Sequence, residues 1–195
     1  VHENHLQKVA RAFGHDHLDA PTFAVIWTTT PWTLPANEAV SVHPDLNYTL
    51  VPTTKGYLIL ALDLARERAE KYGLFPSSDR VFSGVCKGRD LEHVLLKHPF
   101  YERHVNIICG THVTTEAGTG FVHIAPGHGE DDFNLGRVHG LPIPETVNDD
   151  GTFTHHAPGF TGLHVFKAHT AVYDAMHAAG TLAAIGKLTH SYPHS

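Results

Sequence analysis

Residues 118–133 read GTGFVHIAPGHGEDDF, in which a strand rich in β-branched and aromatic residues runs into a glycine-rich turn and then an acidic helix start. Glycines let a ligand approach the backbone closely, and His123 stands at the end of the strand. Asp131 and Asp132 fall in the first helical turn, where complementing the helix dipole alone would explain either one. The stretch therefore predicts a strand, turn and helix that together suit a site.

Similar strand-forming segments recur along the rest of the chain. Each is rich in β-branched and aromatic residues and is bounded by Gly, Pro, Asn or Asp turns. They span residues 22–29, 47–51, 56–61, 80–85, 104–109 and 120–125. Because no regular helix separates each pair, the pattern predicts an α+β fold that is mostly β, with a mostly antiparallel sheet closed into a barrel.

Helices are fewer than strands. Apolar residues at helical spacing, each set followed by glycine, predict helices over residues 62–72, 130–139 and 167–179. The first twenty residues indicate a peripheral helix. Residues 148–152, NDDGT, resemble the start of a calcium loop but lack its bidentate glutamate, so a hairpin turn is favoured. With no repeat and no linker, residues 1–195 are expected to form one domain.

The composition limits the partners that this chain can bind. Its 195 residues are 42% hydrophobic and 17% charged, which fits a globular domain with a sizeable core. Lys and Arg number 14 against 20 Asp and Glu, and the net charge of −6 has the wrong sign for gripping a phosphate backbone over a wide face. No apolar run approaches the ~20 residues of a membrane helix and no signal peptide is recognisable, so a cytoplasmic protein without membrane partners is expected.

Cysteine and histidine content adds two expectations. Cys86 and Cys109 are too few for a disulfide framework, so both are expected to be free thiols. The 19 histidines would make the charge depend strongly on pH between about 5 and 7 if several lie close together.

Residues 27–37, WTTTPWTLPAN, are a second candidate for chemistry. Two prolines prevent either a strand or a helix from continuing, so a rigid turn presents several hydroxyls and an amide. Threonine suits strands, which would explain three threonines in a row. The continuation through PWTLPAN is too particular for an ordinary strand and favours a functional turn.

A metal site is an alternative reading of the first stretch. Residues of metal-ligating types lie within ten positions of one another: His123, His128, Asp131 and Asp132. The only His-x-x-x-His spacing, His190 to His194, contains Pro193, which spoils helical geometry. We therefore expect no metal and no cofactor. Gly-x-Ser-x-Gly, paired cysteines and a phosphate-binding Gly-x-x-x-x-Gly-Lys loop are also absent, so covalent catalysis and nucleotide hydrolysis are poorly supported.

These two stretches and the closing HSYPH of residues 190–194 resemble, in order and spacing, the inserted editing domain, or connective peptide, of bacterial-type isoleucyl-tRNA synthetases. Valine and leucine relatives have Thr-Thr-Arg-Pro where this chain has Thr-Thr-Thr-Pro-Trp-Thr. The resemblance covers most of the chain from about Trp27 onward, and is weak in the first twenty residues and in residues 75–103. It implies a six-stranded β-barrel decorated by helices, the editing-domain fold of class I synthetases. Because the chain starts with valine and the HSYPH phrase leads back to the catalytic domain in that family, we expect a piece of a longer synthetase.

The resemblance also implies a function, proofreading hydrolysis of mischarged Val-tRNA(Ile), with valyl-adenylate as a second candidate substrate. Isoleucine and valine differ by one methylene, worth only about 1–3 kcal/mol in an apolar pocket, so a second sieve is needed; isoleucyl-tRNA synthetase is the standard example. The expected partners are the aminoacylated 3′ end of tRNA(Ile), valine or valyl-adenylate, and the catalytic domain of the parent synthetase. ATP-dependent activation would occur in that absent domain, and the chain itself is expected to be a monomer.

Matching positions carry the family's roles onto this sequence. Asp132 would bind the α-ammonium of the misattached amino acid, and His123 would border the side-chain pocket and help exclude isoleucine. Thr29, Thr30 and Asn37 would hold the terminal adenosine, the ester and an attacking water, so that a positioned water performs the hydrolysis. These five are the expected catalytic residues. A one-position shift to Asp131 is the main alternative for the amine anchor.

A wider set is expected around the substrate, with Thr28 in a supporting role and Trp32 packing at the turn. This substrate-binding set is Thr28, Thr29, Thr30, Trp32, Thr33, His123, Gly127, His128 and Asp132. Two rival functions remain open at this point. One is a binding module for the acceptor end or an aminoacyl-adenosine without turnover, and the other is a metal-dependent hydrolase that uses His123 and Asp132.

Overall fold

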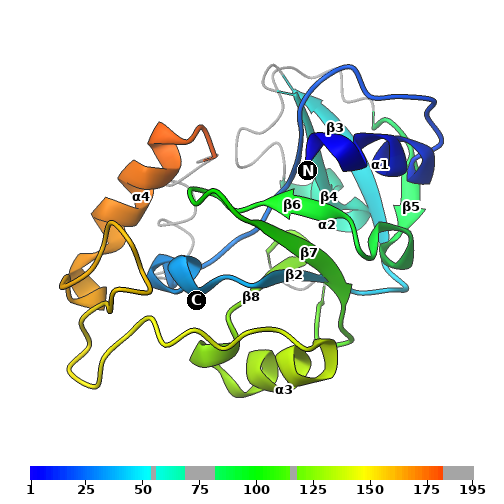
Figure 1. Ribbon diagram of the computed structural model, residues 1–195. Helices are drawn as coiled ribbons and strands as arrows, with labels where there is room; N and C mark the ends of the chain where they lie inside the picture. Colours follow the sequence, from blue (N-terminus) through cyan, green and yellow to red (C-terminus); the bar gives the residue numbers. More distant parts are fainter. Residues whose placement is uncertain (54–55, 69–81, 115–117, 182–195) are drawn as a thin grey trace.

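The structure of the chain, a computed structural model, describes residues 1–53, 56–68, 82–114 and 118–181. Its strands form two four-stranded sheets (Figure 1). The first has the order β1 (Thr22–Ala24), β4 (Gly56–Ala61), β3 (Asn47–Thr53) and β5 (Val85–Lys87). The second has the order β6 (Leu95–Lys97), β7 (His104–Cys109), β2 (Ala39–Val42) and β8 (Phe121–Ile124).

The α+β class is confirmed, but the prediction of a closed six-stranded barrel is wrong. In the described ranges, eight strands divide between two separate sheets. The short strand β2 lies between β7 and β8, so the second sheet ends at β6 and β8 and does not continue into the first. The pairings β1–β4 and β2–β7 are parallel, whereas the other four described pairings are antiparallel, as predicted.

The predicted strands match β3, β4, β7 and β8, of which β3 runs two residues beyond the predicted 47–51, whereas the other four described strands were wrongly bounded or missed. Strands over residues 56–61 and 104–109 have the predicted bounds, and that over 120–125 is one residue shorter at each end. The predicted strand 22–29 stops at Ala24, before the chain enters the proline-containing turn. Strand 80–85 overlaps β5 only at Val85, and its first two residues lie outside the described residues. Both β2 and β6 were missed, because three or four residues carry too little alternation.

The main hydrophobic core joins the two sheets. Tyr48 of β3 is fully buried, packs against Phe121 of β8 with ring centroids 5.1 Å apart, and donates its hydroxyl to the Gly120 carbonyl at 2.6 Å. Gly120 has a φ of +86°, and a Cβ there would lie 2.4 Å from the Cβ of Ala61, so only glycine fits. This contact fixes the start of β8, the strand that carries His123.

Helices flank the second sheet. The helix α3 (Glu130–His139) has its predicted bounds and packs Leu135 against the sheet residues Ile108 and Ile124. The helix α4 (His169–Ala178), predicted over 167–179, packs on the 3-10 turn η2 (Pro31–Ala36) over a second core that contains Leu34 and Val172. Figure 1 shows α3 and α4 on different sides of β8 and β2.

The remaining described helices complete the fold. The helix α1 (Leu6–Ala12) lies at the edge of the molecule, as predicted, yet inserts Val9 into the main core (Figure 1). Of the helix predicted over 62–72, α2 (Leu62–Arg68) is observed, and the rest lies outside the described residues. Short 3-10 turns are η1 (Glu3–His5), η3 (Gly88–Leu91), η4 (Pro126–His128) and η5 (Val165–Lys167). Within the described ranges, no helix is long and apolar enough to cross a membrane.

The hairpin turn and the free thiols were both predicted correctly. Residues 148–152 form a hairpin turn in which the Gly151 N–H donates to the Asn148 carbonyl at 3.0 Å, and the flanking Val147 and Phe153 form a bridge. The thiols of Cys86 and Cys109 are free.

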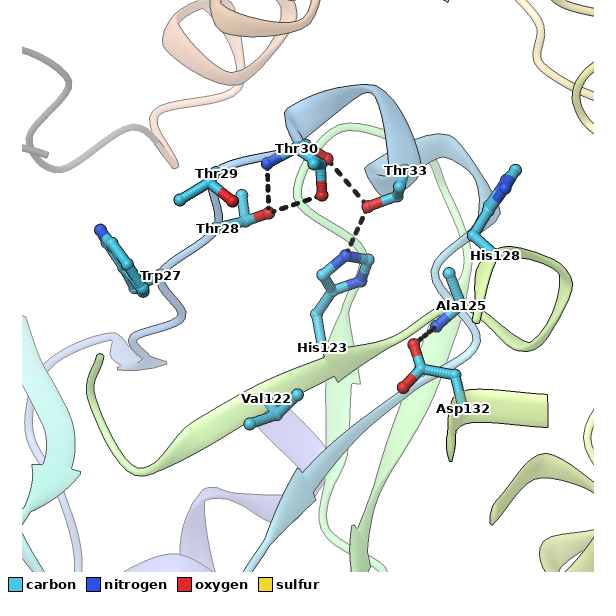
Figure 2. A pocket seen from close by; sticks show the side chains of 10 residues that line it. All are labelled: Trp27, Thr28, Thr29, Thr30, Thr33, Val122, His123, Ala125, His128 and Asp132. Carbon is cyan, nitrogen blue, oxygen red and sulfur yellow. Dashed lines mark hydrogen bonds between the residues drawn. The ribbon is translucent and has the colours of Figure 1, made fainter. Parts of the chain in front are cut away.

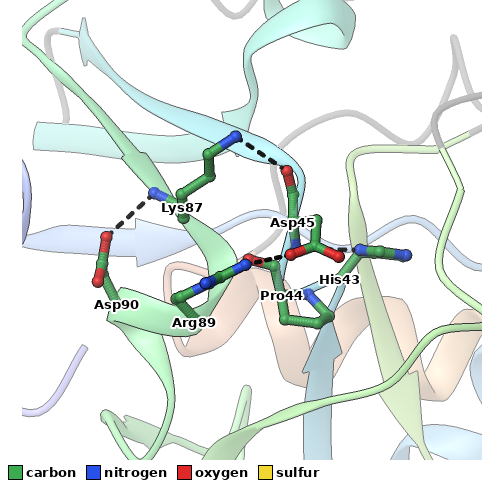
Figure 3. A network of polar contacts seen from close by, with 6 residues as sticks. All are labelled: His43, Pro44, Asp45, Lys87, Arg89 and Asp90. Atoms are coloured by element: carbon green, nitrogen blue, oxygen red, sulfur yellow. Dashed lines mark hydrogen bonds and ion pairs between the residues drawn. The ribbon is translucent and has the colours of Figure 1, made fainter.

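A surface network joins the turn after β2 to η3, where Arg89 pairs with Asp45 (Figure 3).

Candidate functional site

The two stretches singled out in the sequence meet at one cavity of about 240 Å³. One wall is the chain from Trp27 to Thr33, which leads from β1 into η2, and the other is the end of β8 with the following turn and the start of α3. Figure 2 shows the threonines and Asp132 with His123 between them. The lining residues are Trp27, Thr28, Thr29, Thr30, Thr33, Val122, His123, Ala125, His128 and Asp132.

The threonine wall is held by hydrogen bonds within the turn. The Thr28 hydroxyl accepts a hydrogen bond from the Thr30 N–H at 3.0 Å, and the two hydroxyls lie 3.5 Å apart. The Thr33 N–H and the Thr33 hydroxyl both donate to the Thr30 carbonyl, at 3.0 and 2.9 Å. The turn therefore places the Thr28, Thr29 and Thr30 side chains at the cavity in a set geometry.

His123 is held by hydrogen bonds at both ring nitrogens. The Asn37 side-chain Nδ2 lies 2.9 Å from the Ala39 carbonyl and 3.1 Å from His123 Nδ1. Because an amide nitrogen only donates, Nδ1 must be the acceptor and Nε2 must carry the hydrogen. Nε2 then donates to the Thr33 hydroxyl at 2.7 Å. This network fixes both the tautomer and the orientation of the ring.

The same surroundings keep His123 uncharged. Burial, and to a smaller extent His128, lowers the pKa of His123 to about 4. At neutral pH the imidazole is therefore neutral, and the lone pair on Nδ1 is already occupied by Asn37. A group in this state is suited to shaping a pocket, and it has no free nitrogen to take a proton from water.

Asp132 and Asp131 have different surroundings. Asp132 lines the cavity and its Oδ2 accepts a hydrogen bond from the Ala125 N–H at 2.9 Å, whereas Asp131 is exposed. Burial raises the pKa of Asp132, while the Ala125 hydrogen bond and the neighbouring His112 oppose that shift. A half-buried carboxylate at the start of α3 is positioned to bind a cation, and a second oxygen remains beside the one that Ala125 holds.

His128 is anchored at the edge of the cavity. Its Nε2 lies 3.0 Å from the Thr146 hydroxyl, and its ring packs edge-on against Trp32 with centroids 5.1 Å apart. Burial lowers the pKa of His128, and Asp132 opposes that shift. His128 is therefore another histidine whose neutral form is favoured.

The structure brings most of the predicted site residues together but not all. Thr28, Thr29, Thr30, Thr33, His123, His128 and Asp132 line the cavity. Trp32 and Gly127 lie outside the lining, and Asn37 is buried behind His123 with 2% of its surface exposed. The sequence reasoning missed Trp27, Val122 and Ala125 as lining residues. Trp27 and Val122 are each adjacent to a predicted residue, and Ala125 lies two positions from His123. Within the described part of the chain, no three His, Cys, Asp or Glu side chains come together as a metal site would require.

Comparisons with known proteins place this site in context. No family model matches the chain. The isoleucine–tRNA ligase of Dechloromonas aromatica is 53% identical over 199 aligned residues, which cover all of this chain and 21% of that ligase. That of Geobacillus kaustophilus is 47% identical over 181 residues, covering 93% of the chain and 19% of the ligase. The chain thus spans about a fifth of the length of the curated relatives it matches.

Solved structures reveal the same fold at low sequence identity. The structure of GlLeuRS-CP1 superposes with a TM-score of 0.64 at 16% identity and covers 84% of this chain and 83% of its own. The editing domain of the P. knowlesi cytosolic leucyl-tRNA synthetase gives 0.63 at 12% identity, with 82% of each chain covered. Over its whole length the chain is therefore similar to a segment of isoleucine–tRNA ligases, and it has the fold of the class I synthetase editing domain.

Proposed function

We propose that this chain hydrolyses the ester of valine misattached to the terminal adenosine of tRNA(Ile), with valyl-adenylate as a second candidate substrate. The observation that carries the proposal is the convergence of a cation-binding carboxylate, a row of hydroxyls and a fixed neutral imidazole on one cavity. The names of the isoleucine–tRNA ligase relatives and of the leucyl-tRNA synthetase editing domain point the same way. The substrate-binding residues predicted from the sequence would surround the aminoacyl group in this hydrolysis.

Asp132 anchors the substrate in this proposal. An aminoacyl ester keeps its α-ammonium charged, and a half-buried carboxylate binds that group more strongly than a solvated one does. The ammonium would in turn favour the ionised form of Asp132, against the effect of burial on its pKa. Asp131, which is exposed, complements the dipole of α3 instead.

The hydroxyls of Thr29 and Thr30 hold the ester and the attacking water. Water adds to the ester carbonyl, the bond from that carbonyl to the ribose oxygen breaks, and the departing ribose oxygen takes the proton that the water loses and becomes the free hydroxyl. Positioning supplies the rate enhancement, because His123 is neutral and both of its ring nitrogens are in use. Asn37 contributes by fixing His123, and His123 forms the wall that the extra methylene of isoleucine meets.

The net charge of the chain indicates which part of the tRNA it binds. A net charge of −6 suits capture of a single-stranded acceptor end and does not suit binding of the whole tRNA body. We therefore propose that residues 1–195 act as one monomeric editing domain whose tRNA affinity depends on the parent catalytic domain. Aminoacyl-adenylate formation belongs to that other domain.

The experiment is release of valine from Val-tRNA(Ile), with Ile-tRNA(Ile) alongside, by the chain at high concentration. Asp132→Ala is compared with Asp131→Ala, a matched control in the same helical turn that removes an exposed carboxylate. We expect selective release of valine that falls by at least about a hundredfold in Asp132→Ala and by less than about twofold in Asp131→Ala. Equal losses in the two variants would reject Asp132 as the anchor.

Binding without turnover is the second candidate function, favoured by the absence of a free general base at His123. In that case neither form of the chain releases valine, yet Asp132→Ala weakens binding of an aminoacyl-adenosine analogue. A chelator separates the metal-dependent alternative, since only a metalloenzyme would lose its activity.

A further inference from the structure

The turn η2, which follows the pocket threonines, is also held from outside the cavity lining. The Leu34 carbonyl accepts a hydrogen bond from His98 Nε2 at 2.9 Å, and the Pro35 carbonyl accepts one from Arg103 Nη2 at 3.0 Å. Neither His98 nor Arg103 lines the cavity. Two side chains from the loop after β6 therefore hold the backbone of a turn whose other side faces the site.

His98 is fixed in its own surroundings. Its Nδ1 accepts hydrogen bonds from the backbone N–H groups of Phe100 and Tyr101 at 3.3 and 3.1 Å, so Nε2 carries the hydrogen that is donated to Leu34. The ring stacks on Tyr101 with centroids 4.8 Å apart and an interplanar angle of 24°. The residue is only 4% exposed. Both ring nitrogens are thus committed to backbone groups.

The turn needs such external support because of its prolines. Pro35 lies inside η2 and has no N–H to donate within the turn. The Leu34 carbonyl accepts two hydrogen bonds, one from His98 Nε2 and one from the Asn37 N–H at 3.0 Å. Asn37 is the residue whose side chain fixes His123 Nδ1.

We propose that His98 is a positioning residue for the hydrolysis: by holding the Leu34 carbonyl, it sets Asn37 and Thr33, which together orient His123. The inference rests on the proposed function. His98 does not line the cavity and donates to the Leu34 carbonyl, so we expect its effect on turnover to be transmitted through η2. A displacement of a site wall by about 1 Å can cost about a hundredfold in rate.

The kinetic test uses His98→Ala, His98→Gln and a control, Leu91→Ala, which makes a cavity in the main core away from η2. Each is measured with Val-tRNA(Ile) at a temperature where circular dichroism shows it fully folded. For His98→Ala we expect kcat to fall about tenfold to a hundredfold while KM changes by less than about threefold. His98→Gln should recover most of that loss, because its amide can donate to Leu34.

Two kinetic outcomes would overturn the inference. One is a fall in kcat for His98→Ala no larger than that for Leu91→Ala, which would make His98 an ordinary core residue. The other is an effect on KM alone, because a residue that orients His123 through the Leu34 carbonyl should also change the rate of the bound substrate. Leu91→Ala itself is expected to keep kcat within about twofold.

An NMR measurement tests the brace without turnover. In the wild-type chain the ¹⁵N signals of the His123 ring should report a hydrogen on Nε2 alone, and His98→Ala should shift them or add the other tautomer. Leu91→Ala should leave them unchanged. Unchanged His123 signals in His98→Ala would overturn the inference even if the chain is active. Shifted signals in a chain that releases no valine would instead reject the proposed function, and with it the positioning of His123 for hydrolysis by His98.

Discussion

His98 and His123 both hold the turn η2 and both are kept neutral, yet their surroundings differ. His98 bonds only to backbone groups and is almost wholly enclosed, whereas His123 bonds to the side chains of Thr33 and Asn37 and opens on the cavity. Burial is the leading cause of the lowered pKa in both, to about 3 for His98 and about 4 for His123. The difference teaches that one chemical group, kept neutral in both places, can hold a turn from its enclosed side and line a cavity on its open side.

The largest expected difference is in stability. His98→Ala should lower the free energy of unfolding by about 3 kcal/mol, because it leaves the N–H groups of Phe100 and Tyr101 without a partner and opens a cavity. His123→Ala should cost about 1 kcal/mol, since water entering the cavity can reach the groups it abandons. Urea unfolding of both variants measures this. Equal losses would remove the distinction between the closed and the open side.

A second expected difference lies in acid stability. Both histidines have folded-state pKa values below the ordinary 6.5, so the unfolded chain binds protons more readily as the pH falls. Their contribution is complete above pH 6.5 and is lost as the pH drops toward 4 for His123 and toward 3 for His98. Each should add about 1.4 kcal/mol per pH unit to the slope of stability in that window. Unfolding curves from pH 7 to 4.5 should show a shallower slope in His98→Gln, and an unchanged slope would refute the assignment.

Selectivity should separate the two residues in the opposite sense. Under the proposed function, His123→Ala removes the ring that the extra methylene of isoleucine would meet and so enlarges the pocket. The ratio of valine to isoleucine release should then fall by about tenfold, within the range that one methylene provides. His98→Gln should leave the ratio near the wild-type value, because its amide can still donate to the Leu34 carbonyl. Parallel deacylation of Val-tRNA(Ile) and Ile-tRNA(Ile) measures the ratio. A fall of similar size in His98→Gln would mean that the glutamine amide does not replace the imidazole in holding Leu34.

Sequence patterns located both walls of the cavity but could not say which residue lies behind which. The stretches 27–37 and 118–133 were identified because prolines, glycines and acidic residues mark turns and helix starts locally. Asn37 was expected to touch the ester, but it is buried and contacts the cavity only through His123. Depth below a surface depends on contacts 86 residues apart, and no local pattern encodes it.

The same limit explains why the prediction of a closed barrel was wrong. Strands such as Gly56–Ala61 were predicted because their composition suffices, whereas the parallel insertion of β2 beside β7 depends on pairing residues far apart, Ala39 with Asn106 among them. His98 shows a further case. A histidine before a proline in a loop carries no local signal of a role, and only its position below Leu34 reveals one.

The smallest expected effect comes from polar contacts between largely exposed side chains. Asp45, Lys87 and Arg89 make as many hydrogen bonds as His98 does, but the Arg89 and Asp45 side chains are 60% and 67% exposed (Figure 3). Water replaces the partners of an exposed pair when it is broken, so Asp45→Ala should change the free energy of unfolding by less than about 1 kcal/mol. The change should shrink further at high salt. A loss as large as that of His98→Ala in the same urea assay would mean that hydrogen-bond number, and not enclosure, decides the stability of this fold.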